Sequence, residues 1–363
     1  MLNNIYILYN LNKNKKMQKK IISIIVIGLF LTLLFNVNSS PSVKIKFDQM
    51  NSIFYVDDDF NETIPGWNIT NFNKIQNAVN NASTNDTIYV FNGTYYENII
   101  INKSIILTGE SKDSTIISGV NFETGIIVIC NTTNVSISNF NITSLNQNLS
   151  VSGITIRRDS RNIAVKNNII SNNHYGILLY GLKNDVSFNN FLINNISIYV
   201  YSNENIIHHN IVEKNVEGFS ILGENNQIYN NSISQNQYGF KKLGRRSNIT
   251  MNIIINNTYG LWTSYVMYHY DLFNEITNNN FIDNDKNLYR FWNNGNFYRF
   301  WENGFNANYW DEWIGIKYPK LGFLPYRIPG TPNHKYGRLP VYFLNFDRNP
   351  ASEPYDIDIG GMN

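Results

Sequence analysis

The chain of 363 residues lacks several features on which proteins commonly rely. It has one cysteine, Cys130, so no intramolecular disulfide can form. Charged residues make up only 15% of the chain and the formal net charge is +2, so no global charge attracts nucleic acid, and we expect no nucleic-acid partner. Proline is scarce at nine positions while asparagine occupies 65, a composition that excludes collagen, coiled coil and acidic disorder.

Long hydrophobic runs are also lacking. The longest, residues 21–35, falls short of the ~20 residues that span a bilayer, and it lies between Lys19 and Lys20 on one side and small polar residues on the other. We predict that residues 17–40 are a signal peptide or N-terminal anchor and that residues 1–16 are a mis-called upstream segment. The protein is therefore expected to be secreted or at the cell surface, touching a membrane only through this segment if it stays uncleaved.

Asparagine returns in a fixed register in the middle of the chain. One column of asparagines is followed five residues later by a second column, and the spacing along each is 20 to 27 residues. The positions two and nine residues after the first column are apolar in every unit. Codon bias cannot hold such an offset, so the register indicates a structural repeat whose asparagine amides form a ladder. The first column consists of Asn168, Asn190, Asn210, Asn231, Asn252 and Asn279.

Each unit offers three apolar points between turn-forming asparagines, which is too short for a helix pair and suits three short strands. Such units stack as rungs at ~4.8 Å. The predicted fold class is all-β: a single-stranded right-handed parallel β-helix with an N-terminal capping helix and an aromatic-rich C-terminal cap. We assign residues 54–133 to the N-terminal cap and first rungs, 134–295 to the repeats and 296–363 to the C-terminal cap.

Segments near both ends of this region resemble NosD-like parallel β-helix repeat proteins, a pectin-lyase-like group common on archaeal surfaces. The resemblance is carried by residues 55–59 (YVDDD), 86–90 (DTIYV) and 92–95 (NGTY), and toward the other end by 308–310 (NYW) and 353–357 (EPYDI). It spans roughly residues 54–357 and implies the right-handed β-helix fold. The group is named after a periplasmic copper-processing factor, so copper handling is one activity that the resemblance implies.

Residues that could carry chemistry are few. The same fold hosts polysaccharide lyases, esterases and hydrolases, but none of their motifs is present, so the sequence favours a protein without catalysis and predicts no cofactor. The acidic triplet Asp57, Asp58 and Asp59 precedes the repeats and is interpreted as a solvated or capping group. The pair His208 and His209 is interpreted as lying on opposite faces of a strand, so no metal site is expected.

A charged stripe precedes the first strand of successive units and is the candidate ligand-contacting face. A polysaccharide laid along the coil would meet basic residues on several rungs. The alternative is a salt-bridged solvent face, with Lys183 near Glu204 and Glu224 near Arg245. Two tyrosines of one further column could stack on sugar rings. The candidate carbohydrate-binding residues are Arg161, Lys183, Glu204, Glu224, Arg245, Arg246, Tyr238 and Tyr259.

These observations predict an exported cell-surface β-helix with a structural or carbohydrate-binding role. The partner would be a polysaccharide or surface glycan. Two alternatives stay open: a polysaccharide lyase, esterase or hydrolase with an unfamiliar site, and periplasmic copper handling of the NosD type. A pair of carboxylates converging from adjacent rungs would favour the first alternative, and a tight cluster of histidine, methionine and cysteine would favour the second.

Overall fold

The computed structural model describes residues 51–120, 125–145, 151–264, 274–291, 304–311, 326–328, 345–347 and 351–359. The predicted upstream segment and signal segment lie outside these residues, as does most of the predicted C-terminal cap, including Trp301. Among the described residues, no helix is long and apolar enough to cross a bilayer.

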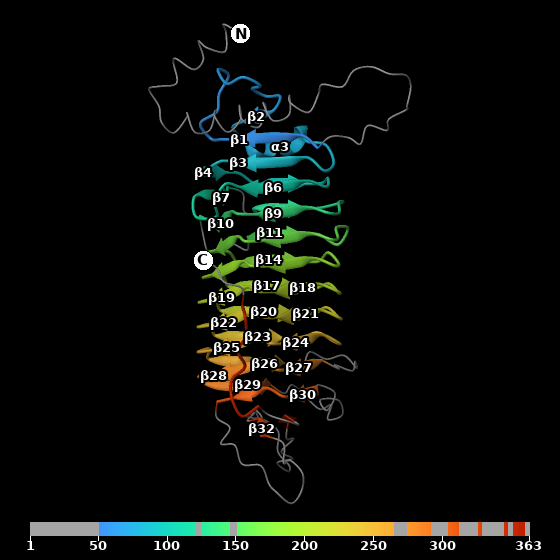
Figure 1. The fold of residues 1–363 in the computed structure, drawn as a ribbon, viewed down its shortest axis with the longest axis vertical. Helices are drawn as coiled ribbons and strands as arrows, with labels where there is room; N and C mark the ends of the chain where they lie inside the picture. The colour runs from blue at the N-terminus through green and yellow to red at the C-terminus, as the bar shows by residue number, and fades with distance from the viewer. Residues whose placement is uncertain are drawn as a thin grey trace, which may run out of the picture. The chain divides into compact units, whose positions relative to one another are not determined.

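Short strands follow one another in sets of three and build three parallel sheets, which stack rung upon rung in Figure 1. Sheet A has the order β2 (Asn71–Phe72), β1 (Ile53–Val56), β3 (Thr87–Val90), β6 (Ile106–Gly109), β9 (Ser136–Ser138), β12 (Ala164–Lys166), β15 (Asp185–Ser187), β18 (Ile206–His208), β21 (Gln227–Tyr229), β24 (Asn248–Thr250), β27 (Glu275–Thr277) and β30 (Gly304–Asn306). Sheet B has the order β4 (Gly93–Tyr96), β7 (Thr115–Gly119), β10 (Asn141–Ser144), β13 (Ile169–Ser171), β16 (Asn190–Leu192), β19 (Ile211–Glu213), β22 (Ser232–Ser234), β25 (Ile253–Ile255), β28 (Asn280–Ile282) and β31 (Tyr309–Trp310). Sheet C has the order β5 (Ile99–Ile101), β8 (Ile127–Ile129), β11 (Ser152–Ile156), β14 (Tyr175–Leu179), β17 (Ile196–Val200), β20 (Glu217–Ile221), β23 (Tyr238–Lys242), β26 (Tyr259–Ser264) and β29 (Lys286–Phe291).

This arrangement is the predicted all-β right-handed parallel β-helix. In the three-residue strands of sheets A and B the middle side chain points inward, because strand residues alternate between faces. In sheet A these inward residues form one apolar file along the core of the coil, and each is at most 2% exposed. The file consists of Val165, Val186, Ile207, Ile228, Ile249 and Ile276.

The structure corrects the predicted register by one residue in a single rung. Asn189, not Asn190, stands in the asparagine column between Asn168 and Asn210. The sequence has two asparagines in a row there, and choosing the second would have placed Ser187 in the core. With Asn189 in the column, Val186 enters the core instead, and the spacing becomes 21 residues on both sides.

The asparagine column forms a continuous hydrogen-bonded ladder inside the coil. The Nδ2 atom of fully buried Asn210 donates to the backbone oxygens of Val186 at 2.8 Å and His208 at 3.0 Å, and to Oδ1 of Asn231 at 3.0 Å. Its own Oδ1 accepts from the backbone N and Nδ2 of Asn189, at 3.0 and 3.1 Å. Each amide therefore satisfies polar groups on its own rung and on both neighbours.

Two further polar rows support the other corners of the coil. The second predicted column is a ladder too, with Asn194 rather than Asn195 as its member on the corrected rung. The sequence analysis missed a third row, which lies in the turns between sheet C and sheet A. Its members are Asn184, Asn205, Asn226, Ser247 and Asn274.

The residue before each ladder asparagine has a left-handed backbone, which turns the chain from sheet A into sheet B. These φ angles lie between 52° and 57°, a region where asparagine is tolerated better than most residues. Phe188, His209 and Met251 occupy it in three rungs, so the corner accepts other side chains when the ladder holds the turn. The corner positions are Asn167, Phe188, His209, Asn230, Met251 and Asn278.

A short helix covers the N-terminal end of the coil. Helix α3 (Ile75–Asn81) covers the first rungs with Ile75, Ala78 and Val79 buried, and the carboxylate of Glu97 accepts from the backbone N of Ile75 and of Gln76 at 2.8 and 3.0 Å. That carboxylate satisfies the first amides of the helix.

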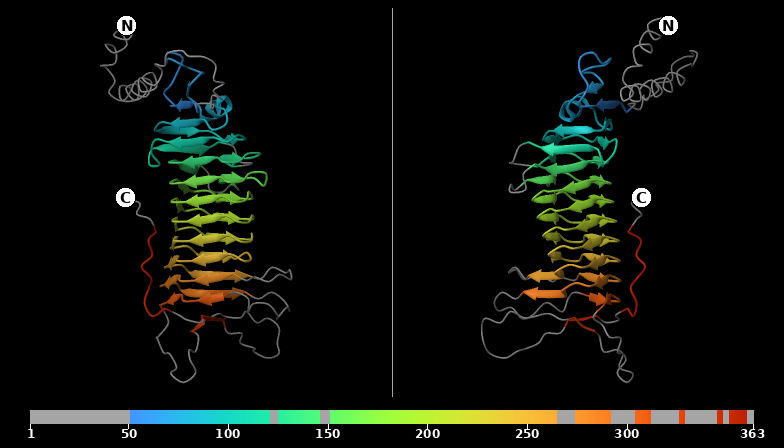
Figure 2. Two further views of the ribbon diagram at one scale, coloured as in Figure 1. Left: turned by 45° about the vertical axis from the view of Figure 1, so that its right-hand side comes forward. Right: turned by 90° about the vertical axis from the view of Figure 1, so that its left-hand side faces the viewer.

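Toward the other end, β32 (Tyr326–Ile328) pairs with β33 (Asn345–Asp347) in an antiparallel ladder. Residues 351–359, coloured red in Figure 2, run back beside the stacked rungs. This segment is fastened where the backbone N and O of Tyr355 bond the side-chain amide of Asn280, both at 2.8 Å. Ile357, 8% exposed, is buried within the same segment.

The corrected register makes a direct prediction. Replacing Asn189 with leucine leaves several buried backbone and amide groups without partners, so we expect a loss of about 1–3 kcal/mol in the free energy of unfolding. The same substitution at half-buried Asn190, on the outer face of β16, should change that free energy by less than about 0.5 kcal/mol. Chemical unfolding of the two variants measures the difference, and equal losses would contradict the register.

Candidate functional site

Aromatic side chains gather on the outer face of sheet C over consecutive rungs. Tyr175 and Tyr199 meet edge to face with ring centroids 5.5 Å apart. Further along the same face Tyr238 stacks on Tyr259 at 5.2 Å, and Trp262 stands edge-on to both. Tyr238 and Tyr259 are register partners, which places their rings one above the other, whereas Tyr175 and Tyr199 meet from offset positions on neighbouring strands. We call this the sheet C face: Tyr175, Tyr199, Glu217, Tyr238, Lys241, Lys242, Tyr259, Trp262 and Lys286.

Cationic side chains lie among these rings. The ammonium group of Lys241 lies 5.0 Å from the ring centroid of Tyr238, and that of Lys286 lies 5.5 Å from the ring of Tyr259. Lys242 donates to the hydroxyl of Tyr199 at 3.4 Å and lies 5.4 Å from its ring. Ammonium groups over ring faces are held by the ring quadrupole, which fixes the positive charge beside the aromatic surfaces.

A shift in strand register brings two consecutive lysines onto this face. The pairing of β20 with β23 slips between Phe219 and Ser220, so Ser220 pairs with Lys242 rather than with Lys241. Strand alternation alone would point one of the two lysines inward. Because of the slip, both lysines lie on the outer face. Lys241 forms an ion pair with the carboxylate of Glu217, a residue that is only 7% exposed. The ion pair compensates a carboxylate that would be costly to bury alone.

Burial favours the neutral form of two phenol groups on this face, those of Tyr175 and Tyr199. Burial is the largest cause raising the pKa of Tyr199, and the hydrogen bond and charge of Tyr201 add to it. Burial likewise raises the pKa of Tyr175. Both phenols therefore keep their protons near neutral pH, and the Tyr199 hydroxyl donates its proton to the hydroxyl of Tyr201 at 3.2 Å.

A shallow hollow borders the sheet C face where β11 and β14 turn toward sheet A. It is lined by Arg157, Arg158, Asp159 and Tyr180. The guanidinium of Arg158 lies 5.9 Å from the ring centroid of Tyr180, and that ring stacks on Tyr201 at 5.0 Å. Cation and ring thus recur together here as they do on the face itself. These residues were not predicted from the sequence, although Arg157 and Tyr180 occupy equivalent positions after the paired strands β11 and β14.

The predicted charged stripe forms ion pairs. Lys183 lies 3.4 Å from Glu204, and Arg245 pairs with Glu224, as the salt-bridged alternative predicted. The corrected register moves Lys183 into the left-handed corner column of Glu204 and Arg246. Arg161 and Arg246 are exposed, and the stripe lies in the turns that follow the sheet C strands. Tyr238 and Tyr259 of the predicted set lie on the sheet C face itself.

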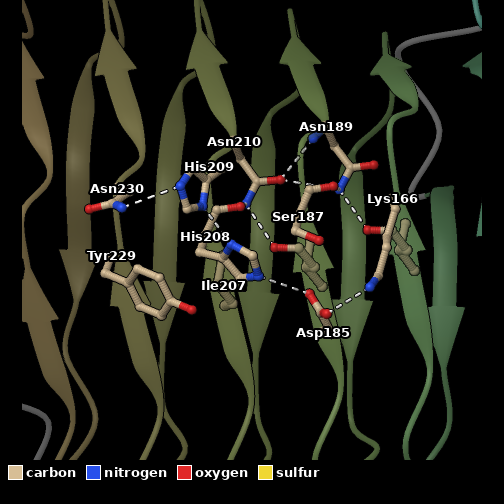
Figure 3. A network of polar contacts seen from close by, with 12 residues as sticks. Lys166, Asp185, Ser187, Asn189, Ile207, His208, His209, Asn210, Tyr229 and Asn230 are labelled. Carbon is tan, nitrogen blue, oxygen red and sulfur yellow. Dashed lines mark hydrogen bonds and ion pairs between the residues drawn. The ribbon is translucent and has the colours of Figure 1, made fainter. Parts of the chain in front are cut away.

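A second polar cluster lies on the outer face of sheet A (Figure 3). The carboxylate of Asp185 forms an ion pair with Nζ of Lys166 at 3.0 Å and lies 3.3 Å from Nε2 of His208. Nδ1 of His208 lies 2.6 Å from Nδ1 of His209, and Nε2 of His209 lies 3.3 Å from the amide nitrogen of Asn230. The prediction that the two histidines face opposite sides is wrong, because the left-handed corner at His209 turns its ring back toward His208.

Charge in this cluster is organised around Asp185. Burial acts to raise the pKa of its carboxyl, but contacts with His208, Lys166 and Ser187 outweigh burial and lower the pKa to about 2. Partial burial and then the charge of His208 lower the pKa of His209, while Asp358 opposes them.

The acidic triplet Asp57, Asp58 and Asp59 is the one group of three possible metal ligands drawn from His, Cys, Asp and Glu within the described residues. Oδ1 of Asp57 accepts from the backbone N of Asp59, and Oδ2 of Asp58 accepts from that of Thr94. These hydrogen bonds stabilise the turn after β1, as expected of a capping group.

Comparison with known proteins places the fold and leaves the activity open. No family model matches the chain, and no curated protein matches it. Pectate lyase Pel9A matches 72% of this chain over 80% of its own, with 15% identity and a TM-score of 0.55. The A-module of the Azotobacter vinelandii mannuronan C-5 epimerase AlgE4 matches 62% of this chain over 70% of its own, with 14% identity and a TM-score of 0.47. A pectin methylesterase from Aspergillus niger matches 68% over 87%, with 12% identity and a TM-score of 0.47. The pectate lyase match supports a pectin-lyase-like parallel β-helix.

The low pKa of Asp185 predicts an acid-dependent contribution to stability. A carboxyl whose pKa falls from 3.8 to about 2 on folding stabilises the protein fully above pH 3.8, and that contribution is lost as pH falls toward 2. After allowance for solvent screening we expect about 1 kcal/mol. Unfolding of the wild type and of Asp185→Asn at pH 6 and pH 2.5 measures it. The stability gap should narrow at the lower pH, and a constant gap would contradict the assignment.

Proposed function

We propose that this protein is an exported cell-surface β-helix that binds an anionic polysaccharide along its sheet C face. The observation that carries the proposal is the contact of three ammonium groups with three tyrosine rings on that face: Lys241 with Tyr238, Lys242 with Tyr199, and Lys286 with Tyr259. Rings stack on the apolar faces of sugars, and ammonium groups pair with carboxylate or sulfate groups of a charged chain.

The charge on the surface favours an anionic ligand. The cations Arg157, Arg158, Lys242 and Lys286 lie on the face or beside its hollow, where Asp159 supplies one carboxylate, while Lys241 is paired with Glu217. The charged stripe borders the same face, and exposed Arg161 and Arg246 extend the positive surface into the turns. Paired stripe residues such as Lys183 and Glu204 contribute less, since their charges compensate each other.

A polysaccharide lyase acting at the same face is the second candidate. Its support is the contact of the Lys242 ammonium with the Tyr199 hydroxyl, which places two groups capable of proton transfer side by side. Binding stays the preferred function, because the contacts between rings and ammonium groups extend over several rungs of this face and suit an extended charged chain. Export is proposed from residues 17–40 alone, and the NosD-like resemblance remains part of the proposal for a surface location.

Removing cations from the face tests the proposal. Lys242→Gln combined with Lys286→Gln should weaken binding to polygalacturonate or alginate at least tenfold at low salt, and the wild-type affinity should fall as salt rises. Tyr259→Ala should weaken binding by a similar factor through lost stacking. Calorimetry or affinity electrophoresis measures these changes.

The control places a charge loss elsewhere. Lys214→Gln, at an exposed corner between sheets B and C and paired with Glu213, should leave binding unchanged. Arg245→Ser with Arg246→Ser measures what the stripe adds. If the wild type binds none of the anionic chains, or if the double lysine variant binds them as well as the wild type does, the proposal is wrong. Release of unsaturated sugars during the assay would favour the lyase instead.

A further inference from the structure

The two adjacent imidazoles on the outer face of sheet A form an arrangement that the proposed function does not use. His208 belongs to β18, and His209 stands at the left-handed corner that follows it. Nδ1 of each ring faces Nδ1 of the other at 2.6 Å. Figure 3 shows the two rings side by side, with Asp185 beyond one and Asn230 beyond the other.

Both rings are held in place by packing. His208 stacks on Tyr229 with centroids 5.0 Å apart and planes 5° apart. His209 stacks on Phe188 at 4.9 Å and 20°. An aromatic neighbour from the next rung in each direction thus fixes the ring planes, so the two Nδ1 atoms are brought together by the fold and lose little rotational freedom if they bind a ligand.

The far nitrogen of each ring has a polar neighbour of the kind that supports a metal-bound histidine. Nε2 of His208 faces the carboxylate of Asp185, itself anchored by Lys166. Nε2 of His209 faces the amide of Asn230, whose Oδ1 is buried and has no hydrogen-bond partner in this structure. A flip of that amide would let Oδ1 accept from Nε2–H of His209. Both rings would then carry their protons on Nε2, leaving two Nδ1 lone pairs directed at one point.

We propose that His208 and His209 bind a divalent first-row transition ion such as Ni²⁺ through their Nδ1 atoms, with water completing its coordination. A bond length of ~2.1 Å and a right angle at the ion require the two nitrogen atoms to be ~3 Å apart. A small rotation of either ring opens the present separation to that value. Without the ion, one Nδ1–H donates to the other Nδ1, and ion binding requires this proton to move to Nε2 of the same ring.

Substitutions that imitate neighbouring rungs test the site without disturbing the coil. His209→Asn introduces the residue found at the corner positions Asn167 and Asn230. His208→Thr introduces the residue found at Thr250, the equivalent outward position of β24. Calorimetry with Ni²⁺ should show one saturable site in the wild type and at least a tenfold loss of affinity in each variant. Asp185→Asn, which removes the support of His208, should weaken binding roughly 10- to 100-fold.

The matched control is His174→Asn, since His174 lies on another corner, where its Nδ1 contacts Asn195 at 3.4 Å. This variant should bind Ni²⁺ as the wild type does, and thermal unfolding should show that the variants remain folded. If the wild type has no saturable site, or if His208→Thr and His209→Asn keep its affinity, the pair shares only a proton and the proposal is wrong. Neither result depends on polysaccharide binding.

Discussion

Hydrogen bonding between rungs through buried side-chain amides is the interaction on which the rest of this structure depends. A coil of short strands has a corner after every strand, and each corner leaves backbone groups that no sheet can pair. The asparagine rows supply the missing partners. Asn210 alone reaches the backbone of two rungs and the amide of a third. Because the rows fix the register, the outer side chains of neighbouring rungs stand directly above one another.

That register explains how functional surfaces arise on so regular a scaffold. The core needs an apolar residue pointing inward and an amide at each corner, which leaves the outward positions free to vary. On sheet C, aromatic residues and lysines occupy those positions, for example Tyr238 and Lys241. On sheet A they include Asp185 and His208, which lie on neighbouring rungs and meet diagonally, since His208 pairs in register with Ser187 and Asp185 with Ile206. The same ladder therefore supports two chemically different faces.

The fold could be predicted from the sequence because its determinants are local and repeated. The offset of five residues between asparagine columns and the inward apolar positions sufficed for the β-helix and for most of the ladder. The rung with Asn189 and Asn190 was ambiguous because the column spacing varies from 20 to 27 residues, and the hydrogen bonds of Asn189 to Asn168 and Asn210, with the burial of Val186, decide for Asn189. The ion pairs of Lys183 with Glu204 and of Arg245 with Glu224 could also be predicted by aligning the repeats.

Features of the candidate sites depend on geometry that spacing does not encode. The two lysines of β23 face outward together because the pairing slips by one residue, and no sequence signal marks that slip. The two histidines converge because a left-handed backbone at His209 breaks strand alternation. Similarly, the carboxylate of Glu97 accepts hydrogen bonds from the first backbone N–H groups of α3, although Glu97 lies more than twenty residues away along the chain.

The central claim is that the sheet C face is where an anionic polysaccharide lies. The most direct measurement is a crystal structure of the protein soaked with an acidic oligosaccharide, such as a short polygalacturonate. The account predicts sugar rings over Tyr238 and Tyr259, with their carboxylates beside Lys242 or Lys286. A saccharide bound instead on sheet A, on sheet B or only along the paired stripe residues would contradict it.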